Sequence, residues 1–287
     1  MRMPADSASP GQPATLPPGR SAWLPFTPRG VAAFASASLG RLLLVEIIIA
    51  LLVAGTLVWF LANTWLPTIR RAIHQLPDQG IISQRKLASP LATASTLAET
   101  RPFLLIVVDL EKQRNASQTS DVLVEFHRNN VQVCAVFGCL LFEYPEGWTV
   151  EFNRQKLEPW WDAWEPIILG LAAPLTILIL LVSWALLATI YCSIVRLLGF
   201  FKDRDLNWRR SWRLASASLM PGAVLLAGGL FGYGLGIVDL FRLLLVFVLH
   251  LATGWVYLAI SPVFVARLPI AAPRSANPFT TDQKPDR

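Results

Sequence analysis

The apolar run at residues 238–266, VDLFRLLLVFVLHLATGWVYLAISPVFVA, constrains the fold more than any other part of the sequence. It is longer than the roughly 20 apolar residues that an α-helix needs to cross a bilayer. Its polar side chains are spaced so that they share one face of a helix; they are Asp239, Arg242, His250, Thr253, Tyr257 and Ser261. Because a helix surrounded by lipid would not carry such a stripe, we expect this candidate intramembrane polar stripe to contact other helices.

Three further apolar runs provide the expected partner helices, and tryptophans at their ends (Trp59, Trp65 and Trp164 among them) are typical of membrane interfaces. Only 15% of the residues are charged, whereas a soluble domain usually carries about 25%. The sequence therefore predicts a membrane α-helical bundle of four transmembrane helices with an inserted small extracytoplasmic α+β domain. The expected division is a disordered cytoplasmic N-terminus (1–28), an interfacial helix and transmembrane helix 1 (29–66), the extracytoplasmic domain (67–161), transmembrane helix 2 (162–199), a basic cytoplasmic loop (200–213), transmembrane helix 3 (214–236), transmembrane helix 4 (238–266) and a disordered cytoplasmic tail (267–287).

Before the first span, residues 31–39 place apolar side chains on one helical face. They either form a short helix at the membrane surface or extend the first span. Glu46 lies about one turn inside that span. We expect it to be an interfacial acid that pairs with Arg41 or extends toward water.

The polar middle of the chain contains a short amphipathic helix that ends at Pro77 and several strand patterns. Residues 81–87 suggest a first strand, and FLLIVVDL at residues 103–110 is typical of a buried strand, with Asp109 as a solvated turn residue. Residues 121–133 predict a hairpin that turns at Asn129-Asn130. A second hairpin is expected between residues 140–144 and 148–152.

Cysteine and glycine spacing give two further expectations. Cys134 and Cys139 could form a disulfide if a tight turn centres on Phe137-Gly138, and buried free thiols are the alternative. In the third span, small residues allow two helix backbones to approach closely, and Pro221 is expected to kink the helix. The helix-packing glycines are expected to be Gly222, Gly228, Gly232 and Gly236.

The loop at residues 196–213 has six Lys or Arg residues, two acidic residues and two interleaved tryptophans. Basic and aromatic residues together can indicate nucleic-acid binding, but two membrane spans flank this loop, so the positive-inside rule accounts for it and no nucleic acid is expected. The loop would attract anionic lipid headgroups. The charge distribution predicts the plasma (inner) membrane with both termini cytoplasmic and the middle domain outside.

Five short motifs lie in order along the chain: PFTPRGVAAF at residues 25–34, Ile73-His74-Gln75-Leu76-Pro77-Asp78, Pro102-Phe103 with Val107-Val108-Asp109, Asp121-Val122-Leu123, and Trp212-Arg213-Leu214-Ala215 leading to Met220-Pro221. With them the chain resembles an uncharacterised family of bacterial multi-pass membrane proteins, a domain of unknown function of which some members are named for maltodextrin-utilisation gene neighbourhoods. The last motif also resembles the membrane core of Yip-type trafficking proteins. The resemblance implies an extracytoplasmic α+β domain inserted after the first span of a helical bundle, and no known activity.

The sequence contains none of the motifs HExxH, P-loop or GxSxG and no paired metal-ligand cysteines, so we expect no enzyme, cofactor or metal site. The leading hypothesis is a non-enzymatic integral membrane protein whose outer domain binds or senses a protein partner or envelope component, with a homo-oligomer as a further option. The alternative is a transport or permeation component that uses the polar stripe. His250 is either a functional residue on that stripe or an imidazole hydrogen-bonded to a neighbouring helix.

Overall fold

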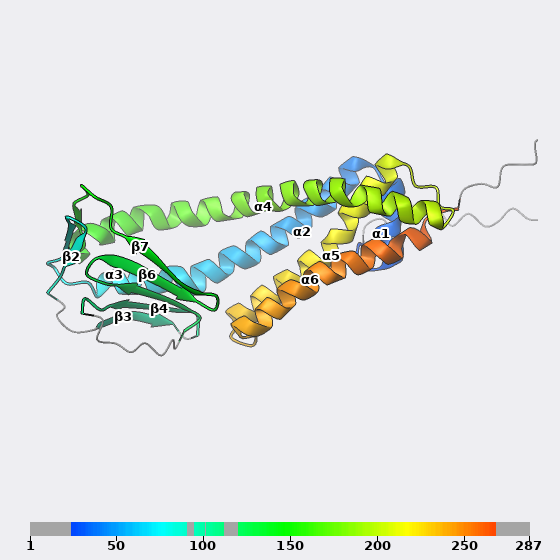
Figure 1. Cartoon of the computed structure of the whole chain (residues 1–287). Helices are drawn as coiled ribbons and strands as arrows, with labels where there is room; N and C mark the ends of the chain where they lie inside the picture. Colours follow the sequence, from blue (N-terminus) through cyan, green and yellow to red (C-terminus); the bar gives the residue numbers. More distant parts are fainter. Residues whose placement is uncertain (1–23, 91–94, 101, 112–119, 268–287) are drawn as a thin grey trace, which may run out of the picture.

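The structure is a computed structural model that describes residues 24–90, 95–100, 102–111 and 120–267. Its long helices are α2 (Leu39–Phe60), α4 (Arg154–Phe201), α5 (Trp208–Gly234) and α6 (Leu240–Ile260). They form a bundle with two small sheets at one end, and α1 (Pro28–Ala33) and the 3-10 turn η4 (Ser261–Phe264) at the other (Figure 1). Each long helix is apolar enough to cross a membrane. The prediction of four long apolar helices and a separate small α+β part is thus confirmed. The expected disordered termini fall almost wholly outside the described residues.

Two of the helices extend well beyond the others toward the sheets (Figure 1). α2 continues through a π-helical turn, η3 (Leu61–Trp65), into α3 (Leu66–His74), which makes one helix of 36 residues. Pro67 does not break this long helix. Proline lacks an N–H, but in the first turn after the π-turn the regular hydrogen-bond pattern is already changed, so the loss is small. α4 has 48 residues, and its first turn is capped by the Asn153 side chain, which accepts a hydrogen bond from the Lys156 N–H at 3.0 Å. The second span was expected to begin near residue 162, but this cap starts the helix eight residues earlier, at Arg154.

The segment before α2 is a helix of its own. Thr27 caps α1, the chain then forms the 3-10 turn η2 (Phe34–Ser36) and becomes extended at Ala37, and Ser38 caps α2. Of the two alternatives, a separate short helix and an extension of the first span, the structure has the separate helix. Val31 and Phe34 are fully buried against the bundle.

The larger sheet has the order β3-β4-β5-β6-β7, with β4 and β5 parallel and every other pair antiparallel. The smaller sheet has the order β2-β1-β8. The strands are β1 (Ile81–Ser83), β2 (Lys86–Ala88), β3 (Ser95–Thr100), β4 (Leu104–Val108), β5 (Val122–Phe126), β6 (Asn130–Ala135), β7 (Gly138–Glu143) and β8 (Val150–Glu151).

Three sequence predictions for this domain were wrong in detail. Residues 81–87 are not one strand but a hairpin, because Gln84 and Arg85 both adopt the left-handed conformation that a two-residue turn requires. The β5–β6 hairpin is present, but it turns one residue earlier than predicted, at Arg128-Asn129. The hairpin between residues 140–144 and 148–152 does not exist, since β7 pairs with β6 and β8 pairs with β1.

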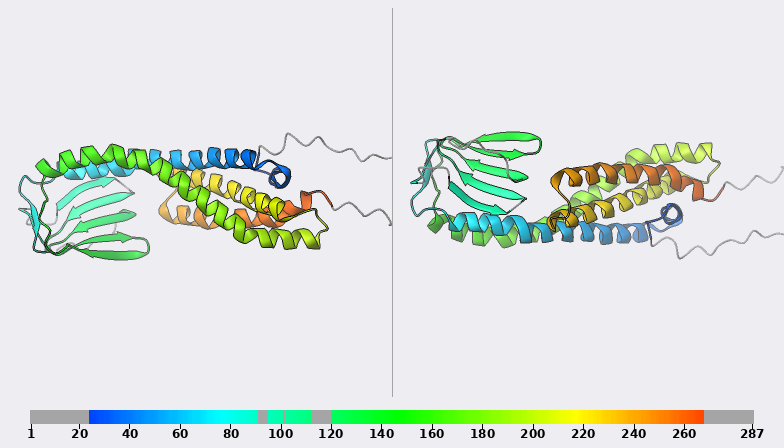
Figure 2. Two further views of the ribbon diagram at one scale, coloured as in Figure 1. Left: turned by 90° about the horizontal axis from the view of Figure 1, so that it is seen from above. Right: turned by 90° about the horizontal axis from the view of Figure 1, so that it is seen from below.

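One face of the larger sheet packs on α3, so the helix that leaves the bundle forms part of the core of the outer domain. Figure 2 shows the sheet lying alongside the two long helices, with its β6–β7 end turned toward the bundle. The shared core runs without interruption from the top of the bundle into the sheet; its buried members include Phe60, Ala72, Leu76, Phe103, Leu104, Ile106 and Tyr233.

Close packing of α5 on α6 depends on glycines, but only in part on those predicted. A Cβ at Gly222 would overlap the backbone carbonyl oxygen of His250, and one at Gly232 would lie 3.1 Å from Val238. Gly228 faces open space, and Gly236 lies beyond the end of α5 with φ of +73°. Those two assignments were wrong. The second close contact with α6 is instead at Gly229, seven residues after Gly222. A Cβ at Gly229 would lie 2.6 Å from Val246.

We predict that Gly222→Ala destabilises the protein by about 1–3 kcal/mol, because the added methyl group would have to displace a helix backbone. Gly228→Ala is the matched control in the same helix and should be neutral or stabilising by about 0.5–1 kcal/mol, as expected for a helical glycine without neighbours. Unfolding of both variants in detergent micelles provides the measurement. Equal losses at the two positions would contradict the assigned α5–α6 contact.

Candidate functional site

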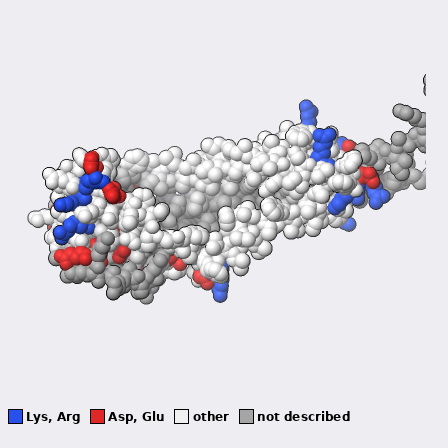
Figure 3. Space-filling view, in the orientation of Figure 1, with Lys and Arg blue, Asp and Glu red and all other residues white. Residues whose placement is uncertain are grey.

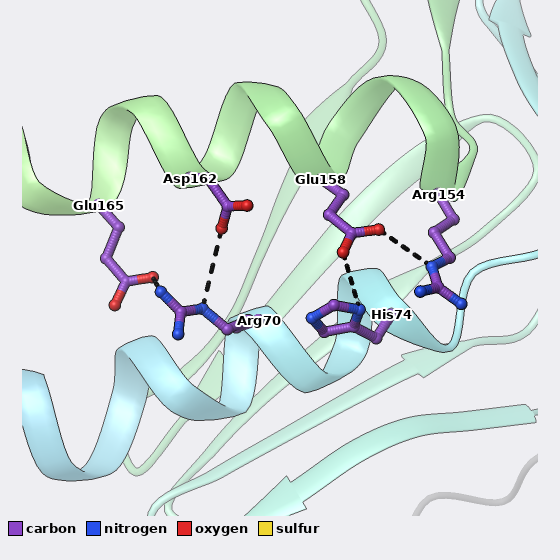
Figure 4. Close-up of polar contacts among 6 residues, drawn as sticks. All are labelled: Arg70, His74, Arg154, Glu158, Asp162 and Glu165. Carbon is purple, nitrogen blue, oxygen red and sulfur yellow. Dashed lines mark hydrogen bonds and ion pairs between the residues drawn. The ribbon is translucent and has the colours of Figure 1, made fainter.

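The two helices that extend from the bundle are joined by a row of ion pairs outside it (Figure 4). Arg70 on α3 donates a hydrogen bond to Glu165 on α4 at 2.7 Å and lies 4.0 Å from the carboxylate of Asp162. One turn further out, His74 lies 3.3 Å from Glu158, which also pairs with Arg154. The three acids on α4 are spaced four and three residues apart and so share one helical face. The row links α3 and α4 along their exposed sides.

A second contact joins the sheet to the top of α5. The rings of Phe60 on α2, Phe103 before β4 and Tyr233 on α5 form a triangle with centroid separations of 5.7, 5.5 and 4.9 Å. The Tyr233 hydroxyl also donates a hydrogen bond of 2.8 Å to Asp121, which lies directly before β5. The outer domain therefore contacts α2, α3 and α5 through these side chains, and Leu157 of α4 and Leu243 of α6 pack against the same core.

Strand β7 is the free edge of the larger sheet: among the described residues it pairs with β6 and with no other strand. All its residues are exposed, including Leu140 at 66%, Leu141 at 61% and Phe142 at 53%. Long apolar edge strands are normally covered or interrupted by charge, because their unpaired backbone recruits further strands. β7 is therefore an exposed and largely apolar edge, with one charged residue, Glu143, which pairs with Arg85 at the end of the strand.

The register shows which backbone groups point outward from this edge. Cys134 and Cys139 face each other with their Cα atoms 4.0 Å apart, the short separation of a non-hydrogen-bonded antiparallel pair. Such pairs alternate with hydrogen-bonded ones, so Leu141 opposite Gln132 is of the same type. The N–H and C=O of Leu141 therefore point away from β6. The Cys134 and Cys139 sulfur atoms are bonded as a disulfide, the first of the two alternatives left open by the sequence.

A group of polar side chains is buried at the carboxyl ends of the two parallel strands. Asp109 after β4 is 1% exposed, so its expected role as a solvated turn residue was wrong. Its carbonyl oxygen lies 2.8 Å from Nδ1 of His127, and Glu125 lies 3.8 Å from Nε2 of the same ring. Tyr144 donates a hydrogen bond to the His127 carbonyl, and burial raises the pKa of its phenol. Within the described residues no cluster of three or more His, Cys, Asp or Glu side chains is placed to hold a metal ion.

The polar stripe on α6 divides into two parts. Asp239 caps the helix and pairs with Arg242 at 3.4 Å, and both are exposed at the helix start. Further along, His250, Thr253 and Tyr257 border the buried positions Gly254, Leu258 and Ser261, which face α5. Thr253 bonds to its own helix, Tyr257 donates to the Phe26 carbonyl at 2.6 Å, and Ser261 is fully buried. Tyr257 and Ser261 thus contact other elements, as expected for the stripe, whereas Thr253 bonds to its own helix and Asp239 and Arg242 are exposed.

A cavity of about 140 Å³ lies beside His250, between α6, α4 and α5. Apart from His250, its polar lining groups are Ser183 and Tyr191 of α4 and the indole of Trp255, which donates a hydrogen bond to the Tyr191 hydroxyl at 3.1 Å. The remaining lining is apolar. The imidazole itself contacts the carbonyl of Phe247 in its own helix. A site of this size and lining would accept a small apolar group rather than a hydrated ion.

Glu46 is a second polar residue, after Asp109, that sequence reasoning placed wrongly. It is 4% exposed and accepts a hydrogen bond from the hydroxyl of Ser216 on α5, so it does not extend toward water. Hydropathy along one helix could not reveal this contact, because the donor lies 170 residues away in sequence. The one available signal was the serine content of α5, in which Ser211, Ser216 and Ser218 are all buried.

The basic loop lies at the bundle end away from the sheets, with its charges partly used inside the molecule. Arg204 donates to the Val265 carbonyl at 2.7 Å, Arg213 donates to the Ala37 carbonyl at 2.7 Å, and Arg210 pairs with Asp205. Arg196, Lys202 and Arg209 are exposed. Figure 3 shows charged side chains over the sheets, at the α5–α6 turn and at the far end of the bundle, with an uncharged surface between them on the face drawn.

Comparison of the chain with protein-family models, with curated proteins and with solved structures finds no match. The resemblance to a bacterial membrane protein family therefore stays a prediction. A strand at residues 140–144 was predicted and overlaps β7, but its pairing with β6 was not predicted. The ion-pair row and the aromatic triangle were not found from the sequence, because each is made by segments that are distant along the chain.

We predict that His250→Leu leaves the protein folded and changes its unfolding free energy by less than about 1 kcal/mol, because the imidazole contacts only its own helix and an apolar cavity. Size-exclusion behaviour and thermal unfolding in detergent test this. Aggregation of the variant would show that His250 holds helices together.

Proposed function

We propose that this chain is a non-enzymatic integral membrane protein whose outer domain binds a protein partner or envelope component. In this proposal the chain crosses the plasma (inner) membrane four times, with both termini and the loop at residues 196–213 on the cytoplasmic side and the sheets on the other side. The uncharged belt between two charged ends supports this placement. The disulfide between Cys134 and Cys139 supports an oxidising compartment for the domain. Arg196, Lys202 and Arg209 are then available for anionic lipid headgroups.

The observation that carries the proposal is the exposed apolar edge at β7. A partner that adds a strand there would bond to the outward N–H and C=O of Leu141 and cover its side chain. The domain that presents this edge is attached without a flexible linker, since α3 and α4 are direct continuations of helices in the bundle. A partner bound at β7 is therefore held at a fixed distance and orientation above the bundle.

The second candidate is transport or permeation through the polar stripe. It is favoured by one observation, the cavity beside His250. The volume of about 140 Å³ and the mostly apolar lining fit a polar path poorly. The binding function therefore accounts for more of the structure.

We predict that Glu146→Cys in the outer domain and Lys202→Cys in the α4–α5 loop are labelled by an impermeant maleimide from opposite sides of the membrane. Both positions are exposed. Cys134 and Cys139 should resist alkylation until the sample is reduced. Labelling of both new cysteines from one side would refute the proposed topology.

We predict that Leu141→Pro abolishes partner binding at β7 without loss of folding, because proline removes an outward N–H and leaves the bonds to β6 intact. Leu141→Thr keeps the backbone donor and is the matched control for loss of the apolar side chain alone. The measurement is the amount of each protein that co-purifies from native membrane extracts, relative to wild type, with thermal unfolding as the folding check. If Leu141→Pro retains every wild-type partner, β7 is not the binding surface.

A further inference from the structure

The β6–β7 turn presents apolar side chains toward the bundle. Val136 is 53% exposed and Phe137 is 85% exposed, although both lie at the end of the sheet that faces the helices (Figures 1 and 2). A turn in water normally carries polar residues. An apolar turn held out from its own sheet indicates that its surroundings are not water.

A groove of about 300 Å³ separates this turn from the bundle. Val136 and Phe137 line one side, and residues of α2, α5 and α6, among them Leu57, Leu230 and Phe247, line the others. Every lining residue is apolar. A groove without a polar group cannot orient a hydrophilic ligand, so its occupant must be hydrocarbon.

The groove lies at the depth of the outer leaflet in the membrane placement proposed above, on which this inference rests. Asp239 and Arg242 mark the water-exposed start of α6. Phe247 follows Asp239 by eight residues, which corresponds to about 12 Å along a helix. The helical wall of the groove therefore extends into the apolar spans, where phospholipid acyl chains are the available hydrocarbon.

We propose that the Val136–Phe137 turn enters the outer leaflet and holds one phospholipid acyl chain against α2, α5 and α6. The disulfide at the base of the turn joins β6 to β7 directly behind it. This bond keeps the two apolar side chains projected from the sheet instead of folded back on it, so the turn is ordered before lipid binds.

Photo-crosslinking in phospholipid nanodiscs whose acyl chains carry an alkyne tag tests the proposal. Benzoylphenylalanine is placed at Phe137, at Leu245 on the exposed face of α6, and at Trp148 beyond the opposite end of β7; all three side chains are exposed. We expect lipid adducts at positions 137 and 245 and a background signal at 148. Adducts at position 245 without adducts at position 137 would overturn the acyl-chain site and leave the membrane placement standing. Absence of adducts at both positions would overturn the membrane placement.

A pair of variants separates a held lipid from mere contact with the bilayer. Native mass spectrometry of the detergent-purified protein measures the bound phospholipid. Phe137→Asp places a charge in the groove and should abolish this binding, whereas Phe137→Leu should retain it. Both substitutions are at an exposed position, so folding should not change. Equal lipid retention by the two variants, or a protein adduct in place of the lipid adduct at position 137, would refute the acyl-chain site.

Discussion

The continuity of two helices across the end of the bundle is the constraint on which the rest of the structure depends. α2 with α3 forms one helix of 36 residues and α4 forms another of 48. Because each helix continues from the bundle to the outer domain, helix geometry fixes where the outer domain begins. The contacts of Arg70 with Glu165 and of His74 with Glu158 link the two helices beyond the end of the bundle. The sheet packs on α3, and its position above the bundle follows from these contacts.

Buried polar contacts add specificity to a bundle whose surfaces are otherwise apolar. Glu46 on α2 bonds to Ser216 on α5, and Arg213 at the start of α5 bonds to the carbonyl of Ala37. Apolar packing is not directional, whereas a buried carboxyl group left without its hydrogen-bond donor is costly. These bonds therefore favour a single pairing of α2 with α5. At the other end, Tyr233 and Asp121 provide the equivalent contact between the bundle and the sheet.

Sequence reasoning succeeded where the signal lies within one segment. The lengths and hydropathy of the four apolar runs predicted the helices, and the β-branched run at residues 104–108 predicted β4. It failed where distant segments decide the outcome: β8 pairs with β1 and not with β7, and the acid at position 46 finds its donor on α5. The glycine assignment failed for a different reason. A spacing of four predicted Gly228 as a contact, but the face that meets α6 is set by Gly222 and Gly229, seven residues apart.

The closure of the small sheet has a consequence for how the chain is assembled. β1 lies soon after α3 and β8 lies just before α4, and these two strands pair, while the Arg154 N–H bonds to the Pro77 carbonyl at 3.4 Å. The entry and exit of the intervening segment are therefore adjacent, as they are in a domain inserted between two halves of another fold. The sheets are thus a domain inserted between the two long helices, α2–α3 and α4. A short connection from α3 to α4 would span the gap, but it would expose the helix residues that share the sheet's core, Phe60, Ala72 and Tyr233.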